Sequence, residues 1–179
     1  AMVYQNQTIE ILLSAISQKN VTRDGYTIMG LAESSDATTV LSTSTTSEAN
    51  KTYYIIWEAA HTHNDITFTE WTATDSLPTE AGNYYLANDV TLSSTWSVPG
   101  TTNLCLNGKT ITLSGYQGSV IEIDSGSTLN LYDCGTLGTI TGGNATNENS
   151  AYRGGGVYIN GGTFNMYAGT ITNNTAKQG

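Results

Sequence analysis

Residues 154–172 repeat a pattern that the chain already contains at residues 119–141. Each stretch has two short segments of alternating apolar residues, a break that contains glycine, and a closing Gly-Thr-Ile-Thr. Apolar residues at every second position are typical of a strand with one buried face. Repeated pairs of such strands indicate a solenoid, in which each coil covers the apolar flank of its neighbour.

Two weaker copies of this pattern lie earlier in the chain, around Asn88-Asp89 and Asn107-Gly108. The first strands of the four copies begin 20, 17 and 36 residues apart, at Tyr84, Leu104, Ile121 and Val157. A repeat of roughly twenty residues is too short for a pair of helices and suits three short strands joined by turns. The sequence therefore predicts a parallel β-helix, with a polar, glycine-rich loop inserted at 142–156.

The apolar positions of these copies predict stacked aliphatic ladders in the core. We expect one ladder on the first strands, formed by Leu104, Ile121 and Val157, and another on the second strands, formed by Ile111, Leu129 and Phe164. We also expect inward side chains at Leu106, Ile123 and Ile159, with Cys105, Glu122 and Tyr158 outside. Because the side-chain period of a strand is two, a slip of one residue would reverse all of these orientations. Trp71 or Trp96 is expected to plug the first end of the core.

The charge of the chain excludes two classes of partner. Its 179 residues carry a formal net charge of −9, with a pI near 4.3, whereas proteins that bind nucleic acids or anionic membranes need a basic face. No apolar run approaches the length of a membrane span, since the longest, at 9–16, is interrupted by Glu10 and Ser14. We therefore expect no nucleic-acid partner and no membrane insertion.

The first third of the chain has a different character, because sixteen of the nineteen glycines lie at or after Gly100. Helical spacing of apolar residues predicts a short amphipathic helix at 8–18. A turn leads into a strand at 23–30, a candidate strand spans 38–41, and the aromatic and β-branched stretch 51–57 predicts another. A helix followed by strands within so short a segment indicates a small α+β module.

The motif Arg-x-Gly-Tyr-Thr-Ile-x-Gly at 23–30, followed by Asn-Lys-Thr-Tyr-Tyr-Ile-Ile-Trp-Glu at 50–58, resembles the Listeria–Bacteroides repeat, also called the internalin B-repeat. The resemblance covers about residues 8–58 and implies a small β-grasp module of the kind strung along bacterial surface proteins. We therefore assign residues 1–58 to a β-grasp-like module and residues 59–80 to a linker that enters the solenoid.

Residues 67–108 resemble the opening coils of β-helix regions in large surface proteins of gut Gram-positive bacteria, and residues 154–176 are similar to their repeating coils. These regions belong to the broad pectin-lyase-like architecture. The resemblance implies a right-handed parallel β-helix over residues 81–179, in a secreted or wall-attached bacterial protein of which this chain is a fragment. We expect a structural and adhesive role, with a glycan or a host surface as the partner.

His61 and His63 would share one face of a strand, and with Asp65 they would offer three metal ligands. Zinc sites in proteins use three or four protein ligands, and this polar stretch has no further His or Cys close in sequence. We therefore expect an ordinary linker here, with no metal and no other cofactor.

Cys105 and Cys134 are the only cysteines of the chain. In the predicted register Cys105 points outward, and Cys134 lies just past the second strand of the next coil. A disulfide would need their Cα atoms to lie within about 7 Å. Two free thiols are the expected state, and a disulfide is the alternative.

The candidate acidic residues of the predicted coils are Glu122, Asp124 and Asp133. Polysaccharide lyases and hydrolases need clustered carboxylates, to hold calcium or to act as acid and base. No second acidic residue aligns with these on neighbouring coils, so we expect solvated surface charge and no catalytic residue. The alternative is the first part of a carbohydrate-active β-helix enzyme whose catalytic coils lie beyond Gly179.

Outward-facing residues of the last coils form the candidate ligand surface. Exposed aromatic side chains on a rigid surface suit sugar binding, and the sequence offers Tyr132, Tyr158 and Tyr167. Asn130 and Asn165 are expected to stack as an amide ladder. The Thr-x-Thr triplets at 110–112, 139–141 and 170–172 resemble the threonine arrays of ice-binding solenoids. In the predicted register only the last two triplets share a face. Ice binding is therefore a minor alternative function. After Thr172 no capping segment follows, so we also expect weak self-association through the open last coil.

Overall fold

The computed structural model of the protein describes residues 6–23, 26–135, 137–146 and 154–177. The chain divides into two compact units, Ala1–Ala60 and His61–Gly179, and each is described by itself. Of the expected linker and entry segment at 59–80, residues 61–80 therefore fall within the second unit. Of the inserted loop expected at 142–156, residues 147–153 lie outside the described residues.

The first unit packs a helix beside a two-stranded antiparallel sheet. The predicted helix is confirmed as α1 (Ile9–Gln18), and β1 (Tyr26–Ala32) pairs with β2 (Tyr54–Ala59). Ile9 and Leu12 of the helix are buried together with Leu31 of β1. The free amides of the first helical turn find partners in the 43–45 segment, since the Ile9 amide donates to the Thr45 carbonyl at 2.9 Å.

The prediction of a strand at 38–41 is wrong. Leu41 makes one bond to the sheet, from its amide to the carbonyl of Leu31 at 2.8 Å, but no ladder follows. Val40 instead lies directly over Gly30, where a Cβ atom would come within 2.8 Å of the valine Cβ. Val40 therefore packs on the sheet, and the segment does not join it as a strand.

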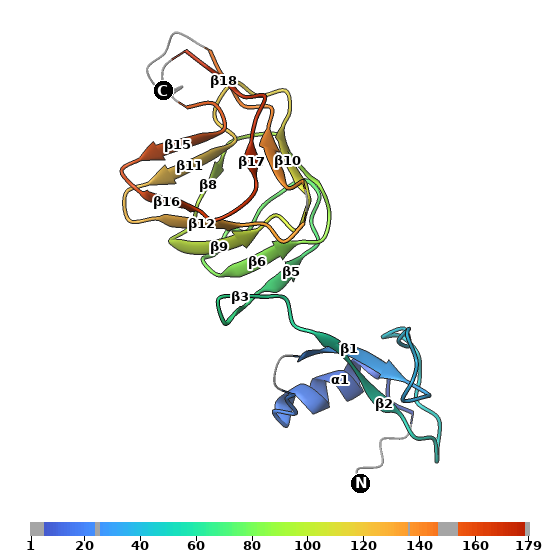
Figure 1. Cartoon of the computed structure of the whole chain (residues 1–179). Coiled ribbons are helices and arrows are strands. Elements are labelled where there is room, and N and C mark those ends of the chain that lie inside the picture. Colours follow the sequence, from blue (N-terminus) through green and yellow to red (C-terminus); the bar gives the residue numbers. More distant parts are fainter. Residues whose placement is uncertain (1–5, 24–25, 136, 147–153, 178–179) are drawn as a thin grey trace. The chain divides into compact units, whose positions relative to one another are not determined.

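The second unit is built from three parallel sheets that the chain visits in turn (Figure 1). The first sheet contains β5 (Thr69–Trp71), β6 (Asn83–Leu86), β9 (Thr101–Cys105), β12 (Thr128–Tyr132) and β16 (Thr163–Met166). The second contains β7 (Val90–Leu92), β10 (Thr110–Leu113), β13 (Thr139–Thr141) and β17 (Thr170–Ile171). The third contains β8 (Trp96–Ser97), β11 (Ile121–Asp124) and β15 (Val157–Asn160). This arrangement is mainly β and is consistent with a β-helix-like solenoid.

Two small sheets complete the second unit. A parallel pair joins β14 (Asn144–Ala145) to β18 (Thr175–Ala176). An antiparallel hairpin joins β3 (Thr62–His63) to β4 (Ile66–Thr67) just before the first coil.

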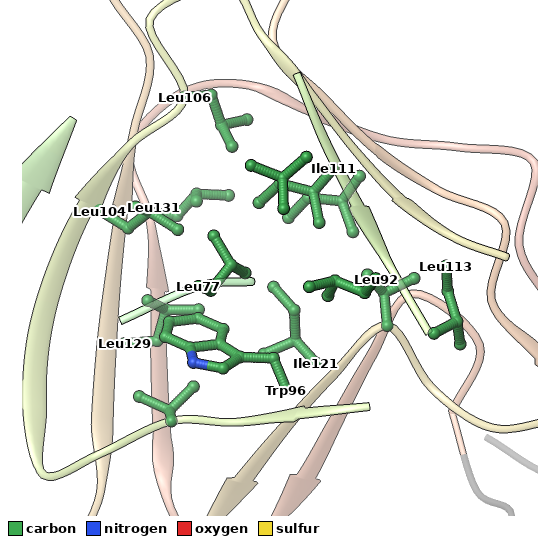
Figure 2. Close-up of a cluster of buried hydrophobic side chains, with 14 of the residues drawn as sticks. Leu77, Leu92, Trp96, Leu104, Leu106, Ile111, Leu113, Ile121, Leu129 and Leu131 are labelled. Atoms are coloured by element: carbon green, nitrogen blue, oxygen red, sulfur yellow. The ribbon is translucent and has the colours of Figure 1, made fainter. Parts of the chain in front are cut away.

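The core is a set of side-chain ladders between the three sheets (Figure 2). Two predicted pairings are confirmed, because Ile121 aligns with Val157 and Leu129 aligns with Phe164. Two others are wrong, because Leu104 aligns with Leu131 and Ile111 aligns with Val90 and Ile140. The reason is that all three sheets carry the same period-two pattern, so that pattern alone does not say which sheet a strand joins.

The predicted side-chain orientation of β11 is confirmed, since Ile123 is fully buried and Glu122 is only partly so. Ile159 aligns with Ile123 as expected, but its side chain is half exposed. Leu106 is buried but follows the end of β9, outside the Ile123 ladder. Cys105 is also fully buried, although it belongs to a cluster separate from the coil core.

Both tryptophans named as plugs contribute to the first end of the core. Trp96 is buried within it, and its indole N–H donates to the carbonyl of Pro78 at 2.9 Å. Trp71 packs against the same cluster, and its indole N–H donates to the carbonyl of Ser76 at 2.8 Å. Each ring thus buries its apolar body while its polar N–H remains satisfied.

Candidate functional site

The two histidines are held by the tight hairpin that opens the second unit. Asn64 and Asp65 both have positive φ angles, 49° and 63°, as the two central residues of a type I′ hairpin turn require. His63 pairs with Ile66 across the hairpin, and the amide of Phe68 donates to the carbonyl of His61 at 2.8 Å. This backbone fixes both imidazoles on one side of the hairpin.

The two cysteines come from consecutive coils of the first sheet. Cys105 ends β9 and aligns with Tyr132 of β12, while Cys134 follows β12 by two residues. The turn that carries Cys134 is organised by the carboxylate of Asp133. This carboxylate accepts the backbone N–H groups of Gly108 at 2.7 Å, Gly138 at 2.9 Å and Gly135 at 3.1 Å. Asp133 was expected as solvated surface charge, but its carboxylate is part of the turn itself.

The four side chains converge on one point. The two Sγ atoms lie 3.6 Å apart, the two Nε2 atoms lie 3.1 Å apart, and Cys134 Sγ lies 3.6 Å from His61 Nε2. All four atoms lie within 4.8 Å of one another, and both thiols are free. Asp65, expected as the third candidate ligand, is exposed in the hairpin turn and is not part of this cluster.

Aromatic rings surround the cluster. The ring of His61 stacks on Tyr85 with centroids 4.2 Å apart, and that of His63 stacks on Tyr132 at 4.9 Å. Phe68 meets His63 edge-on at 5.0 Å. These rings exclude water from one side of the imidazoles and hold their orientation.

Burial sets the protonation of these groups. It lowers the pKa of both histidines, and the neighbouring His63 charge lowers that of His61 further. The charge of Asp133 raises the pKa of His63, but this effect is smaller than the lowering caused by burial. Burial raises the pKa of the Cys105 thiol to about 12. Without a bound cation, neutral pH therefore favours neutral imidazoles and a protonated Cys105.

Sequence reasoning did not find this cluster, because its members are separated by up to 73 positions along the chain. One signal was available, since the chain has only two histidines and two cysteines. The missing information was the register that places Cys105 beside Tyr132 and the hairpin that turns back over both.

The asparagine ladder is confirmed and is longer than expected. Asn165 donates to Asn130 at 2.8 Å, Asn130 donates to Asn103 at 2.9 Å, and Asn103 donates to Asn83 at 2.7 Å. One amide chain thus crosses four strands of the first sheet.

The structure does not bring the three candidate tyrosines together. Tyr132 and Tyr167 stack with centroids 4.7 Å apart, but Tyr132 is 7% exposed while Tyr167 is 60% exposed. Tyr158 lies in β15 of the third sheet, opposite Glu122.

All three threonine triplets share the second sheet, where two had been expected on one face.

Tyr158 instead lines a shallow groove of about 520 Å³ over the third sheet. The groove is lined by the side chains of Tyr116, Glu122 and Asn160 and by several serine and threonine residues. The Tyr158 hydroxyl donates to Asn160 Oδ1 at 3.3 Å, and Asn160 Nδ2 donates to Asp124 at 2.8 Å. Burial raises the pKa of Glu122, and the charge of Asp124 adds to this effect.

Comparison of the chain with protein-family models, curated proteins and solved structures finds no match. The resemblances to the Listeria–Bacteroides repeat and to pectin-lyase-like β-helices therefore stay predictions. No helix among the described residues has the length and apolar character needed to cross a membrane.

Proposed function

We propose that this chain is a non-catalytic structural and adhesive module of a bacterial cell-surface protein, which contacts glycans through the groove beside Tyr158. In this proposal the first unit is a β-grasp-like spacer of the Listeria–Bacteroides type. The second unit is the start of a right-handed parallel β-helix of the pectin-lyase-like architecture. The protein would act outside the cell, attached to the surface or the wall.

The groove beside Tyr158 is the observation that carries the proposal. The faces of Tyr116 and Tyr158 can pack on the apolar face of a sugar ring. Asn160 and Ser97 add polar side chains along the same groove. A rigid sheet carries these groups, because each coil is bonded to the next by backbone ladders.

The arrangement of the carboxylates favours binding over catalysis. Hydrolysis of a glycosidic bond needs a pair of carboxyl groups that flank the bond. Glu122 is the one carboxylate among the described residues that lines the groove. Asp124 accepts the amide of Asn160, and Asp133 accepts three backbone amides.

A glycan array probed with the whole chain tests this proposal. We expect binding of a subset of glycans, with at least a tenfold loss of affinity in Tyr158→Ala. The matched control is Tyr54→Ala, because Tyr54 is an exposed tyrosine of β2 in the first unit. An array without any bound glycan, or equal losses in both variants, would contradict the proposal.

A further inference from the structure

We propose that His61, His63, Cys105 and Cys134 form a structural Zn²⁺ site that ties the opening hairpin to two successive coils of the second unit. This inference is independent of glycan binding, because the cluster and the groove share no residue. The four ligands come from the hairpin, from the end of β9 and from the turn after β12.

The distances fit a tetrahedral site. Zinc bond lengths of about 2.3 Å to sulfur and about 2.05 Å to nitrogen give tetrahedral edges of about 3.8 Å for S–S, about 3.3 Å for N–N and about 3.6 Å for S–N. Three of the six separations match these edges, at 3.6 Å between the sulfur atoms, 3.1 Å between the nitrogen atoms and 3.6 Å between Cys134 Sγ and His61 Nε2. All four donor atoms lie within 4.8 Å of one another. A disulfide would need the sulfur atoms at about 2.05 Å, so the pair is spaced as co-ligands of one ion.

The chemistry of the donors selects the metal. Two thiolates with two imidazoles in a tetrahedral arrangement favour zinc over hard cations such as Mg²⁺ or Ca²⁺, which take oxygen ligands. Both histidines direct Nε2 toward the cluster, and the neutral imidazole is the form that binds a metal. Every histidine and every cysteine of the chain takes part.

Binding replaces two protons with one ion. Zn²⁺ binds the two thiols as thiolates, two protons leave to solvent, and no electron is transferred. With four protein ligands no coordination position stays open for water, so the site is structural and not catalytic. The ion links residues 61–63 to Cys105 and Cys134 and thereby holds the hairpin over the outer face of the first sheet.

The surroundings of the cluster support this role. The rings of Tyr85, Tyr132 and Phe68 pack on the two imidazoles, and an apolar shell of this kind controls the access of solvent to a metal site. The Asp133 carboxylate fixes the turn that bears Cys134 by accepting three backbone amides.

The test uses the whole chain, prepared with reducing agent, and measures metal content by mass spectrometry and Co²⁺ binding by absorption. We expect one Zn²⁺ per chain. Co²⁺ added to the zinc-free protein should give the visible bands of a tetrahedral ion and the near-ultraviolet band of thiolate-to-cobalt charge transfer. Added Zn²⁺ should then displace the cobalt. A chelator should lower the midpoint temperature of unfolding.

Two variants make the result specific. Cys134→Ser changes an exposed side chain and should abolish the charge-transfer band and the effect of the chelator. Asp65→Asn is the matched control, because Asp65 lies in the same hairpin outside the cluster, and it should bind metal as the wild type does. The absence of bound zinc together with the absence of the cobalt band in reduced wild-type protein would overturn the proposal. A Cys105–Cys134 disulfide that yields no metal binding after reduction would also overturn it.

Discussion

At the scale of single residues, burial separates side chains that the repeat pattern treats as equal. Ile123 and Ile159 occupy the same position of successive strands and align in the third sheet. Ile123 is fully buried, whereas Ile159 is half exposed because β15 stands at the edge of its sheet. Truncation of Ile123 therefore measures the contribution of a core side chain to the free energy of unfolding, and truncation of Ile159 is the control.

We predict that Ile123→Ala lowers the free energy of unfolding by about 2–5 kcal/mol, as truncation of a well-packed aliphatic side chain does. Ile159→Ala should cost less than about 1 kcal/mol, since much of the isoleucine side chain already contacts water. Urea unfolding of the two variants and the wild type measures both values. Similar losses for the two variants would show that the register of β11 and β15 is wrong.

At the scale of the element, the first sheet carries a chain of amide hydrogen bonds through Asn83, Asn103, Asn130 and Asn165. Asn130 is an inner member and both donates to and accepts from its neighbours, whereas Asn165 is an end member with a single ladder bond. Removal of an inner member leaves a donor and an acceptor without partners, which costs more than loss of an end bond.

We predict that Asn130→Ala lowers the free energy of unfolding by about 1–3 kcal/mol and that Asn165→Ala lowers it by about 0.5–1.5 kcal/mol. Chemical denaturation of the two variants compares an inner ladder position with an end position in the same chain. If Asn165→Ala cost as much as Asn130→Ala, the ladder would not act as a connected unit.

At the same scale, the sequence pattern predicts some strand pairings correctly and others not. Period-two patterns located the strands around Ile121, Leu129, Val157 and Phe164 and gave their mutual pairing correctly. Those patterns are identical in the three sheets, so they do not determine the partner of Leu104. The sequence placed Leu104 in one ladder with Ile121, whereas it aligns with Leu131.

The candidate metal cluster lay beyond this kind of reasoning for a different reason. Its geometry depends on long-range placement, because the hairpin residues lie far in sequence from Cys105 and Cys134. Period and propensity describe neighbours along the chain, and they carry no information on which distant side chains meet.

At the scale of the whole molecule, the arrangement of acidic groups bears on the enzyme alternative. We predict that the chain releases neither unsaturated nor reducing ends from polygalacturonate or other acidic polysaccharides, with or without Ca²⁺. Such reactions need clustered carboxylates, and of the described carboxylates only Glu122 lines the groove. Product release measured over hours, and lost in Asp124→Ala, would contradict this prediction.

The last described coil presents apolar side chains and strand edges together. β15, β16 and β17 each stand at the end of their strand order, with unpaired backbone groups on the outer side. Ile159, Met166 and Tyr167 are exposed on these strands or directly beside them. Open edges of this kind pair with other strands, and a second copy of the chain offers the same edge.

We therefore predict that the protein self-associates weakly through this coil. Light scattering should give a mean mass that rises with protein concentration, and Met166→Lys should keep the chain monomeric, because a charge on the edge strand opposes pairing. Leu137→Lys is the matched control, since Leu137 is 77% exposed but lies outside β15, β16 and β17. It should associate as the wild type does. A wild-type mass that stays monomeric at high concentration would show that the edge is stable in water without a partner, and equal association of Met166→Lys would place the contact on another surface.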